Sequence, residues 1–242
     1  MLRQFGSDLG FVPLVIGGCS VMFIFTLLAS GGDFMGGGLN FLSPSSRALT
    51  VFGMSGAYPV FIQGRWWTIL TASWLHGGVL HIFFNMMAVR NLAPSTIALI
   101  GPGRTVTIYV LSGAAGFLLT SAMRMYFPYI PFLTGAVTTV GASAAICGLL
   151  GAITHYGRTS GSSLIRSQTS QWAISMAIYS LLPGVDSVAH LGGFLGGYGL
   201  SAYFNPLSRE RGDHMLIGVL CLVATALALM YSAWQGLSLL AA

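Results

Sequence analysis

Residues 141–152 read GASAAICGLLGA, a run of small and apolar residues with a single serine, Ser143, near its head. Glycine, alanine and cysteine carry small side chains, so a membrane helix built from them lets a second helix pack very close to it. A hydroxyl group inside such a helix needs a polar partner. The segment therefore raises two questions: which helix approaches it, and which group the serine meets.

The composition is that of a polytopic membrane protein. Of the 242 residues, 55% are hydrophobic and 6% are charged, and the mean hydropathy is +0.79, which lies outside the usual composition of soluble domains. Several charge-free intervals can hold the roughly 20 apolar residues that cross a bilayer as a helix. They predict seven spans, at about residues 11–30, 77–95, 104–122, 141–157, 169–183, 187–204 and 214–236.

These spans predict an all-α membrane helix bundle that forms a single domain over residues 1–242. Its core would be six helices over about residues 11–204, followed by one extra C-terminal helix at about 214–236. The first span has no convincing small-residue cleavage site, so we expect it to be retained. Residues 31–75 are predicted to form a long interfacial loop, with Trp66, Trp67 and Trp74 at headgroup level. That loop is either a plain connector or also a gate.

The basic residues bear on orientation in the membrane. The chain has ten basic residues, all of them arginine, and five acidic ones; in a membrane protein this excess is a topology signal and does not indicate nucleic-acid binding. Arg47, Arg65 and Arg124 fall on one side of the predicted spans, and the other seven arginines fall on the N-terminal side. We therefore expect a cytoplasmic N-terminus. The absence of lysine and of a targeting segment fits a bacterial inner membrane.

The cysteines give no sign of a metal site or a disulfide. Cys19, Cys147 and Cys221 lie in apolar spans without ligand spacing, so we interpret them as small packing residues. We expect no cofactor and no metal.

Polar residues within the spans are the first candidates for function, because they are costly in a membrane. His81 and Asn85 are four residues apart on the second span and so share one helical face. Ser143 opens the fourth span, and His190 lies just inside the sixth. With a cytoplasmic N-terminus, all three spans run inward from the outer face, which places the four residues at one depth near that face.

Small residues predict which of these helices touch. Ser143, Cys147 and Gly151 form a stripe on the fourth span, and a stripe of the sixth holds His190, Gly193, Gly197 and Ser201. If the stripes face each other, the serine and the histidine meet at the outer end of the contact. An imidazole can take the proton of a serine hydroxyl at neutral pH. Ser143 is then a candidate nucleophile and His190 a candidate general base.

Acyl transfer also needs hydrogen-bond donors directed at the developing oxyanion, each worth on the order of 3 kcal/mol. His81 and Asn85 are the side-chain candidates. The amide of Ser143 is a third, because amides at the start of a helix lack intrahelical acceptors.

At these residues the sequence resembles the rhomboid family of intramembrane serine proteases. The resemblance rests on GASA at 141–144 as the GxSx motif, HIFFN at 81–85 as HxxxN, and HLGGFLGG at 190–197, which contains HxxGxxxG. It implies a Ser143–His190 dyad, an oxyanion hole from His81, Asn85 and the Ser143 amide, and substrates that are transmembrane segments with helix-destabilising residues. It also implies a water-filled cavity open to the outer face.

The chain departs from the family pattern at three places. Ala144 stands where a glycine often follows the serine, and Cys147 stands where many relatives carry an aromatic residue beside the histidine. In the loop, the sequence RWWT at 65–68 places the arginine before the tryptophans. None of these changes removes a reacting group.

The remaining polar and aromatic residues have simpler interpretations. Asp186 lies four residues before His190, but an N-cap role is expected for it in place of a third catalytic residue. His76 is read as interfacial, with lining of the water entry as the alternative. His155 and His214 are read as interfacial, and Trp172 and Phe194 as packing or lipid-contact residues.

Three functions follow from these patterns. The favoured one is an intramembrane serine endopeptidase whose partners are transmembrane protein substrates and the lipid bilayer, with no nucleic acid. The alternatives are a proteolytically inactive relative that binds transmembrane clients, and a small transporter or channel. The sequence does not indicate the substrate, the cleavage-site preference or the oligomeric state.

Overall fold

The computed structural model describes residues 10–32, 42–131 and 133–241, and it confirms the predicted helix bundle. Long helices occupy all the ranges predicted as spans: α1 (Phe11–Ala29), α4 (Val79–Ile100), α5 (Pro102–Tyr126), α6 (Ser143–Thr159), α7 (Ser163–Tyr179), α8 (Ser187–Tyr203) and α9 (Gly212–Ala241). Most bounds agree within a few residues. Helix α7 begins earlier than predicted because Ser162 caps it, accepting a hydrogen bond from the amide of Ile165 at 3.3 Å.

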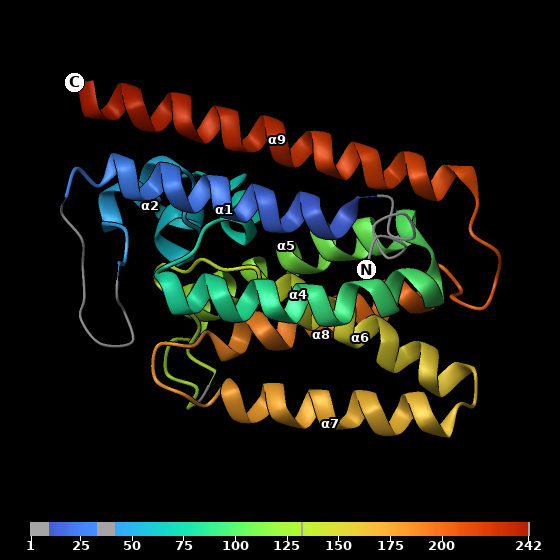
Figure 1. The fold of residues 1–242 in the computed structure, drawn as a ribbon. Coiled ribbons are helices and arrows are strands. Elements are labelled where there is room, and N and C mark those ends of the chain that lie inside the picture. Colours follow the sequence, from blue (N-terminus) through green and yellow to red (C-terminus); the bar gives the residue numbers. More distant parts are fainter. Residues whose placement is uncertain (1–9, 33–41, 132, 242) are drawn as a thin grey trace.

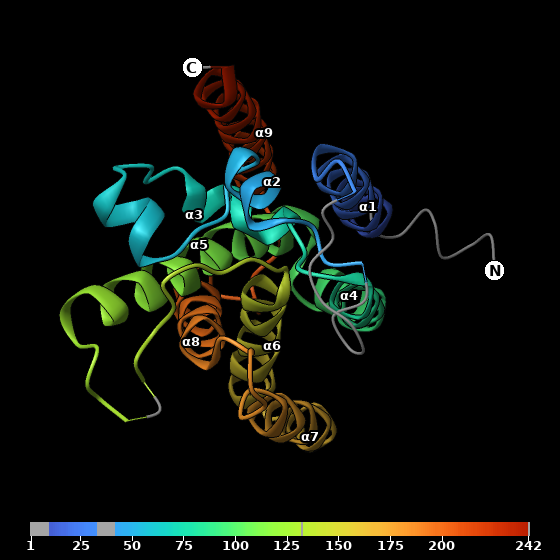
Figure 2. The same cartoon turned by 90° about the vertical axis from the view of Figure 1, so that its left-hand side faces the viewer.

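The long helices lie side by side and alternate in direction. Figure 1 shows α1 beginning at the end of the bundle opposite to the end where α9 finishes. Seen down the bundle in Figure 2, α1, α7 and α9 lie at the periphery around α5, α6 and α8. Within the described residues, α1, α5 and α9 are long and apolar enough by length and composition to cross a membrane.

The central contact joins α6 to α8 through small residues, as predicted, and it includes Gly151 of the predicted α6 stripe, where a Cβ would overlap the carbonyl oxygen of Phe194. A Cβ on Gly193 would overlap the carbonyl oxygen of Ala144, and one on Gly197 would overlap that of Gly148. The contact face of α6 therefore also includes Ala144 and Gly148, which the predicted stripe left out. The predicted stripe of Ser143, Cys147 and Gly151 is therefore only part of the contact face, because the sequence alone does not fix the rotation of a helix that is small on several faces.

Residues 42–75 are more ordered than the predicted loop. They contain α2 (Ser46–Val51), a π-helical turn at Tyr58–Ile62, α3 (Thr68–Thr71) and a 3₁₀ turn at Ala72–Trp74. Residues 33–41 of the predicted loop lie outside the described residues. The expectation for Trp74 was wrong: its side chain is buried, and its ring lies where a Cβ on Gly18 of α1 would be.

Helix α9 packs on α5 and is tied to this segment by two polar contacts. Arg65 Nε donates to Gln235 Oε1 at 2.9 Å, and Trp67 Nε1 donates to Ser232 Oγ at 2.9 Å. Both donors directly precede α3, so α9 anchors the segment that leads into α3.

Candidate active site

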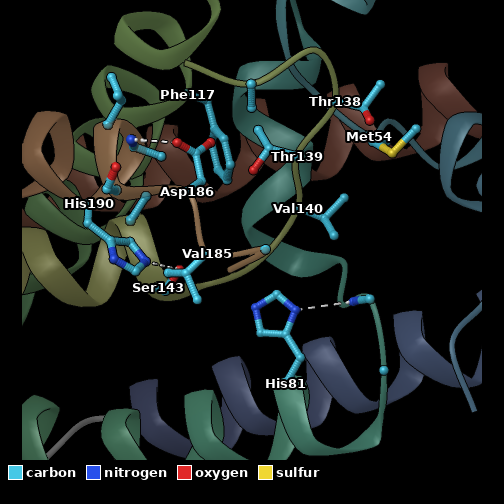
Figure 3. A pocket seen from close by; sticks show the side chains of 18 of the residues that line it. Met54, His81, Phe117, Thr138, Thr139, Val140, Ser143, Val185, Asp186 and His190 are labelled. Carbon is cyan, nitrogen blue, oxygen red and sulfur yellow. Dashed lines mark hydrogen bonds between the residues drawn. The ribbon is translucent and has the colours of Figure 1, made fainter. Parts of the chain in front are cut away.

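Ser143 and His190 meet as the sequence predicted. The distance from His190 Nε2 to Ser143 Oγ is 2.7 Å, and Figure 3 shows the two side chains pointing toward each other. Ser143 is the first residue of α6, and His190 lies in the first turn of α8, so the close helix contact brings them together. The imidazole is 5% exposed. An imidazole nitrogen at this distance can exchange a proton with the hydroxyl.

The other side of His190 is occupied by two residues that sequence reasoning missed. Ser180 Oγ lies 2.6 Å from His190 Nδ1. The ring of Tyr179 stacks beside the imidazole, with ring centroids 6.3 Å apart and an angle of 19° between the planes. Tyr179 therefore supplies, from α7, the aromatic neighbour that is absent at Cys147. The sequence did contain one indication of this contact: the connection from α7 to α8 is short, so the end of α7 must lie near the start of α8.

His81 lies across the site from this pair, with its ring held by the backbone. The Gly77 amide donates to His81 Nδ1 at 3.3 Å, so the proton of a neutral ring lies on Nε2. The position that a Cβ on Gly141 would take is 2.6 Å from His81 Nε2 and 3.7 Å from Ser143 Oγ. The Nε2–H of His81 and the hydroxyl of Ser143 thus flank one small space above Gly141.

Asn85 lies one turn further along α4 and is directed differently. Its Nδ2 donates to the carbonyl of His81 at 2.8 Å, and its side chain is buried. Asn85 is not among the residues that line the cavity, whereas His81 is. The structure therefore places Ser143, His190 and His81 at the cavity, whereas Asn85 does not line it.

A cavity of about 1090 Å³ opens at this end of the bundle. Four segments and Phe117 of α5 line it; the segments are residues from Ser43 to Met54, from Gly77 to Phe84, from Thr134 to Ala144, and from Tyr179 to His190. Figure 3 shows Ser143 and His190 facing each other, with Val185 beside Ser143, and His81 across the pocket from them; all four residues line the cavity. The reacting side chains are thus reached from the cavity and enclosed by apolar helices elsewhere.

The loop that leads into Ser143 is fixed by backbone contacts. Thr139 pairs with Ser55 in an isolated antiparallel bridge, and the Gly141 amide donates to the carbonyl of Ala72 at 2.9 Å. Gly141 has φ 134°, a conformation that favours glycine. This loop geometry places the first amides of α6, which have no intrahelical acceptor, beside the Ser143 hydroxyl.

Two other polar residues have defined positions near the site. Asp186 caps α8, as predicted, with Oδ1 accepting from the Ala189 amide at 3.0 Å and from Thr120 Oγ1 at 2.8 Å. The interfacial expectation for His76 was wrong: it is fully buried, and its ring packs edge-on against His81 with centroids 5.2 Å apart. Burial is the main cause that lowers the pKa of His76, which keeps the ring neutral.

The other two histidines lie away from the cavity and pack against neighbouring helices. His155 Nδ1 lies 3.2 Å from Ser201 Oγ, between α6 and α8. His214, at the start of α9, accepts a hydrogen bond from Arg104 Nε at 3.1 Å. Neither residue lines the cavity.

These features define a class of protein: a membrane-type helix bundle in which a serine–histidine pair lines a cavity. Comparison with known proteins identifies the family within this class. The Rhomboid domain model matches residues 63–207, well over half of the chain. The chain therefore belongs to the rhomboid family, and its apolar helices agree with an integral membrane protein.

Individual relatives differ in what their names describe. The chain is 28% identical over 194 residues to rhomboid protease GluP of Bacillus subtilis, covering 78% of this chain and 36% of that protein. It is 34% identical over 169 residues to RHOMBOID-like protein 7 of Arabidopsis thaliana, covering 65% and 49%. It is 29% identical over 160 residues to inactive RHOMBOID-like protein 8 of the same plant, covering 64% and 42%. The chain thus spans between about a third and a half of the length of these relatives.

Proposed function

We propose that this chain is an intramembrane serine endopeptidase with Ser143 as nucleophile and His190 as general base. The observation that carries the proposal is the 2.7 Å contact between Ser143 Oγ and His190 Nε2 at the floor of the cavity. A serine hydroxyl is a weak nucleophile on its own, and a base in hydrogen-bond contact is the arrangement that activates it.

The reaction would proceed by acyl transfer in two stages. Ser143 Oγ attacks the scissile carbonyl carbon while its proton passes to His190 Nε2; the peptide C–N bond then breaks, and the same proton goes to the leaving amine. In the second stage His190 takes a proton from water and the resulting hydroxide equivalent attacks the acyl carbon. The ester bond to Ser143 Oγ then breaks, the proton on His190 goes to Ser143 Oγ, and the new carboxyl terminus leaves. No cofactor enters either stage.

The oxyanion would be held in the space above Gly141. His81 Nε2–H borders that space, and the Ser143 amide begins α6 beside it. Donors preorganised in this way stabilise negative charge that develops only in the transition state. Asn85 contributes by holding the carbonyl of His81, so its role is better described as support for α4.

The cavity and the family membership support a substrate class. An intact helix keeps its carbonyls in internal hydrogen bonds, whereas an extended polypeptide leaves them free for attack. We therefore propose transmembrane segments with helix-destabilising residues as substrates. The excess of arginine on the N-terminal side of the predicted spans supports a cytoplasmic N-terminus, with the site near the outer face of the membrane.

The test is labelling of the purified chain with a fluorophosphonate probe, followed by cleavage of a fluorogenic transmembrane peptide in vesicles. Wild-type protein should label at Ser143 and cleave, while Ser143→Ala and His190→Ala should do neither and should keep the helical circular dichroism spectrum. Cleavage by Ser143→Ala at the wild-type rate would exclude the proposal.

A proteolytically inactive role is the second candidate, because the relatives include one named as inactive. Such a protein would bind a transmembrane client without hydrolysing it. Capture of the same peptide by wild-type protein, with neither labelling nor cleavage, would favour this candidate.

A further inference from the structure

The hydroxyl of Ser180 lies between two groups, and its hydrogen can serve only one of them. Ser180 Oγ donates to the carbonyl of Met176 at 2.7 Å and lies 2.6 Å from His190 Nδ1. A serine hydroxyl has one hydrogen and two lone pairs. With the hydrogen on Met176, the oxygen faces His190 as an acceptor.

Assigning the Ser180 hydrogen to Met176 implies a position for the proton of His190. An acceptor at Nδ1 requires a proton on Nδ1, and a neutral imidazole with that proton has an unprotonated Nε2. Nε2 is the nitrogen that faces Ser143 Oγ. Only this tautomer can receive the proton of the nucleophile; the other would direct an N–H at it.

No carboxylate performs this task in the described part of the chain. Asp186 Oδ1 accepts from Thr120 and from the Ala189 amide, where it caps α8. Tyr179 stacks on the imidazole face and so limits its rotation, but its contact is with the ring plane. The hydrogen-bond partner at Nδ1 is Ser180.

We propose that Ser180 is a positioning residue that holds His190 in the tautomer and orientation needed for a general base. This rests on the proposed function. Ser180 directly follows the last residue of α7, and within α7 all side chains except that of Thr169 are at least partly exposed. The orientation of the base therefore depends on a peripheral helix that packs mainly on α6.

The experiment compares Ser180→Ala and Ser180→Thr with a matched control, Ser170→Ala. Ser170 lies within α7, the helix that ends just before Ser180, and makes the same kind of hydroxyl-to-carbonyl bond, to Arg166 at 2.7 Å, but it is exposed. For Ser180→Ala we expect kcat and the fluorophosphonate labelling rate to fall roughly 10- to 100-fold, below the full contribution of a general base, with KM within about 2-fold of wild type. Ser180→Thr should recover most of the rate, and Ser170→Ala should match wild type.

A second measurement does not depend on activity. In protein labelled with ¹⁵N-histidine, and with the His190 signals assigned from a His190→Gln sample, we expect a protonated Nδ1 in wild type and in Ser180→Thr. Ser180→Ala should lose that preference. An unchanged tautomer in Ser180→Ala would overturn the proposal even if the protein proved inactive.

The kinetic outcomes separate the two proposals. Wild-type protein that neither labels nor cleaves would count against the proposed function, and the ¹⁵N spectra would then decide the role of Ser180. Active wild type with Ser180→Ala within about 2-fold in kcat would overturn the positioning role. So would a rise in KM at unchanged kcat, because that result would assign Ser180 to substrate binding.

Discussion

Gly193 of α8 lies so close to Ala144 of α6 that a Cβ on the glycine would overlap the carbonyl oxygen of Ala144. Ala144 directly follows Ser143, and Gly193 lies one turn after His190. The backbone contact therefore sets the distance between the two reacting side chains.

Gly193→Ala should force α6 and α8 apart and destabilise the fold by about 1–3 kcal/mol, as overpacking does elsewhere. Fluorophosphonate labelling should fall with it, because Ser143 and His190 separate. Gly199→Ala is the matched control, since Gly199 lies on the same helix and no atom lies within 4 Å of the position that its new methyl group would take. Reversible unfolding in mixed micelles measures the difference, and equal stability of the two variants would refute the close-contact argument.

Gly141→Ala should lower the labelling rate without unfolding the protein. The new methyl group would meet His81 Nε2 at 2.6 Å and occupy the space assigned to the oxyanion, and φ 134° is strained for alanine. Gly64→Ala also changes a glycine at positive φ, but with open space around it, so it controls for backbone strain alone. Labelling kinetics would distinguish them; similar rates would remove Gly141 from the site.

His81→Ala should reduce kcat by about 10²-fold or more, the loss typical of one oxyanion donor. Asn85→Ala should cost less, because the Asn85 amide is bonded to the His81 carbonyl and is absent from the cavity lining. Steady-state cleavage of one fluorogenic peptide by both variants tests the order. A larger loss in Asn85→Ala would restore the direct role that the sequence motif implies for it.

Removing the α9 contacts should weaken the fold with little direct effect on chemistry. The double variant Ser232→Ala and Gln235→Ala deletes the partners of Trp67 and Arg65. At roughly 1 kcal/mol for each hydrogen bond, we expect a loss of about 2 kcal/mol in the free energy of unfolding. Ser238→Ala is the control, since that exposed hydroxyl bonds only to the Gln235 carbonyl. A double variant as stable as the control would show that α9 is not anchored through these residues.

Much of the site was predictable, because polar side chains are energetically costly inside a membrane and these recur at helical spacing. Ser143, His190 and His81 are polar groups in apolar helices. The N-cap role of Asp186 was predictable too, because it needs only local sequence. The full contact face of α6 was not, since Ala144 and Gly148 are as small as the predicted Cys147 and Gly151, and only packing decides which of them meet α8.

The order of residues along the chain was enough to predict the helical membrane-type bundle, the positions of its long helices, and the pairing of Ser143 with His190. Those features depend on hydropathy, helical periodicity and small-residue spacing, which are local properties of a chain. The partners of His190 on its second side, Ser180 and Tyr179, and the withdrawal of Asn85 behind His81 came from the three-dimensional structure alone. These depend on how the end of α7 packs near the start of α8 and on side-chain rotamers, which neither composition nor spacing encodes.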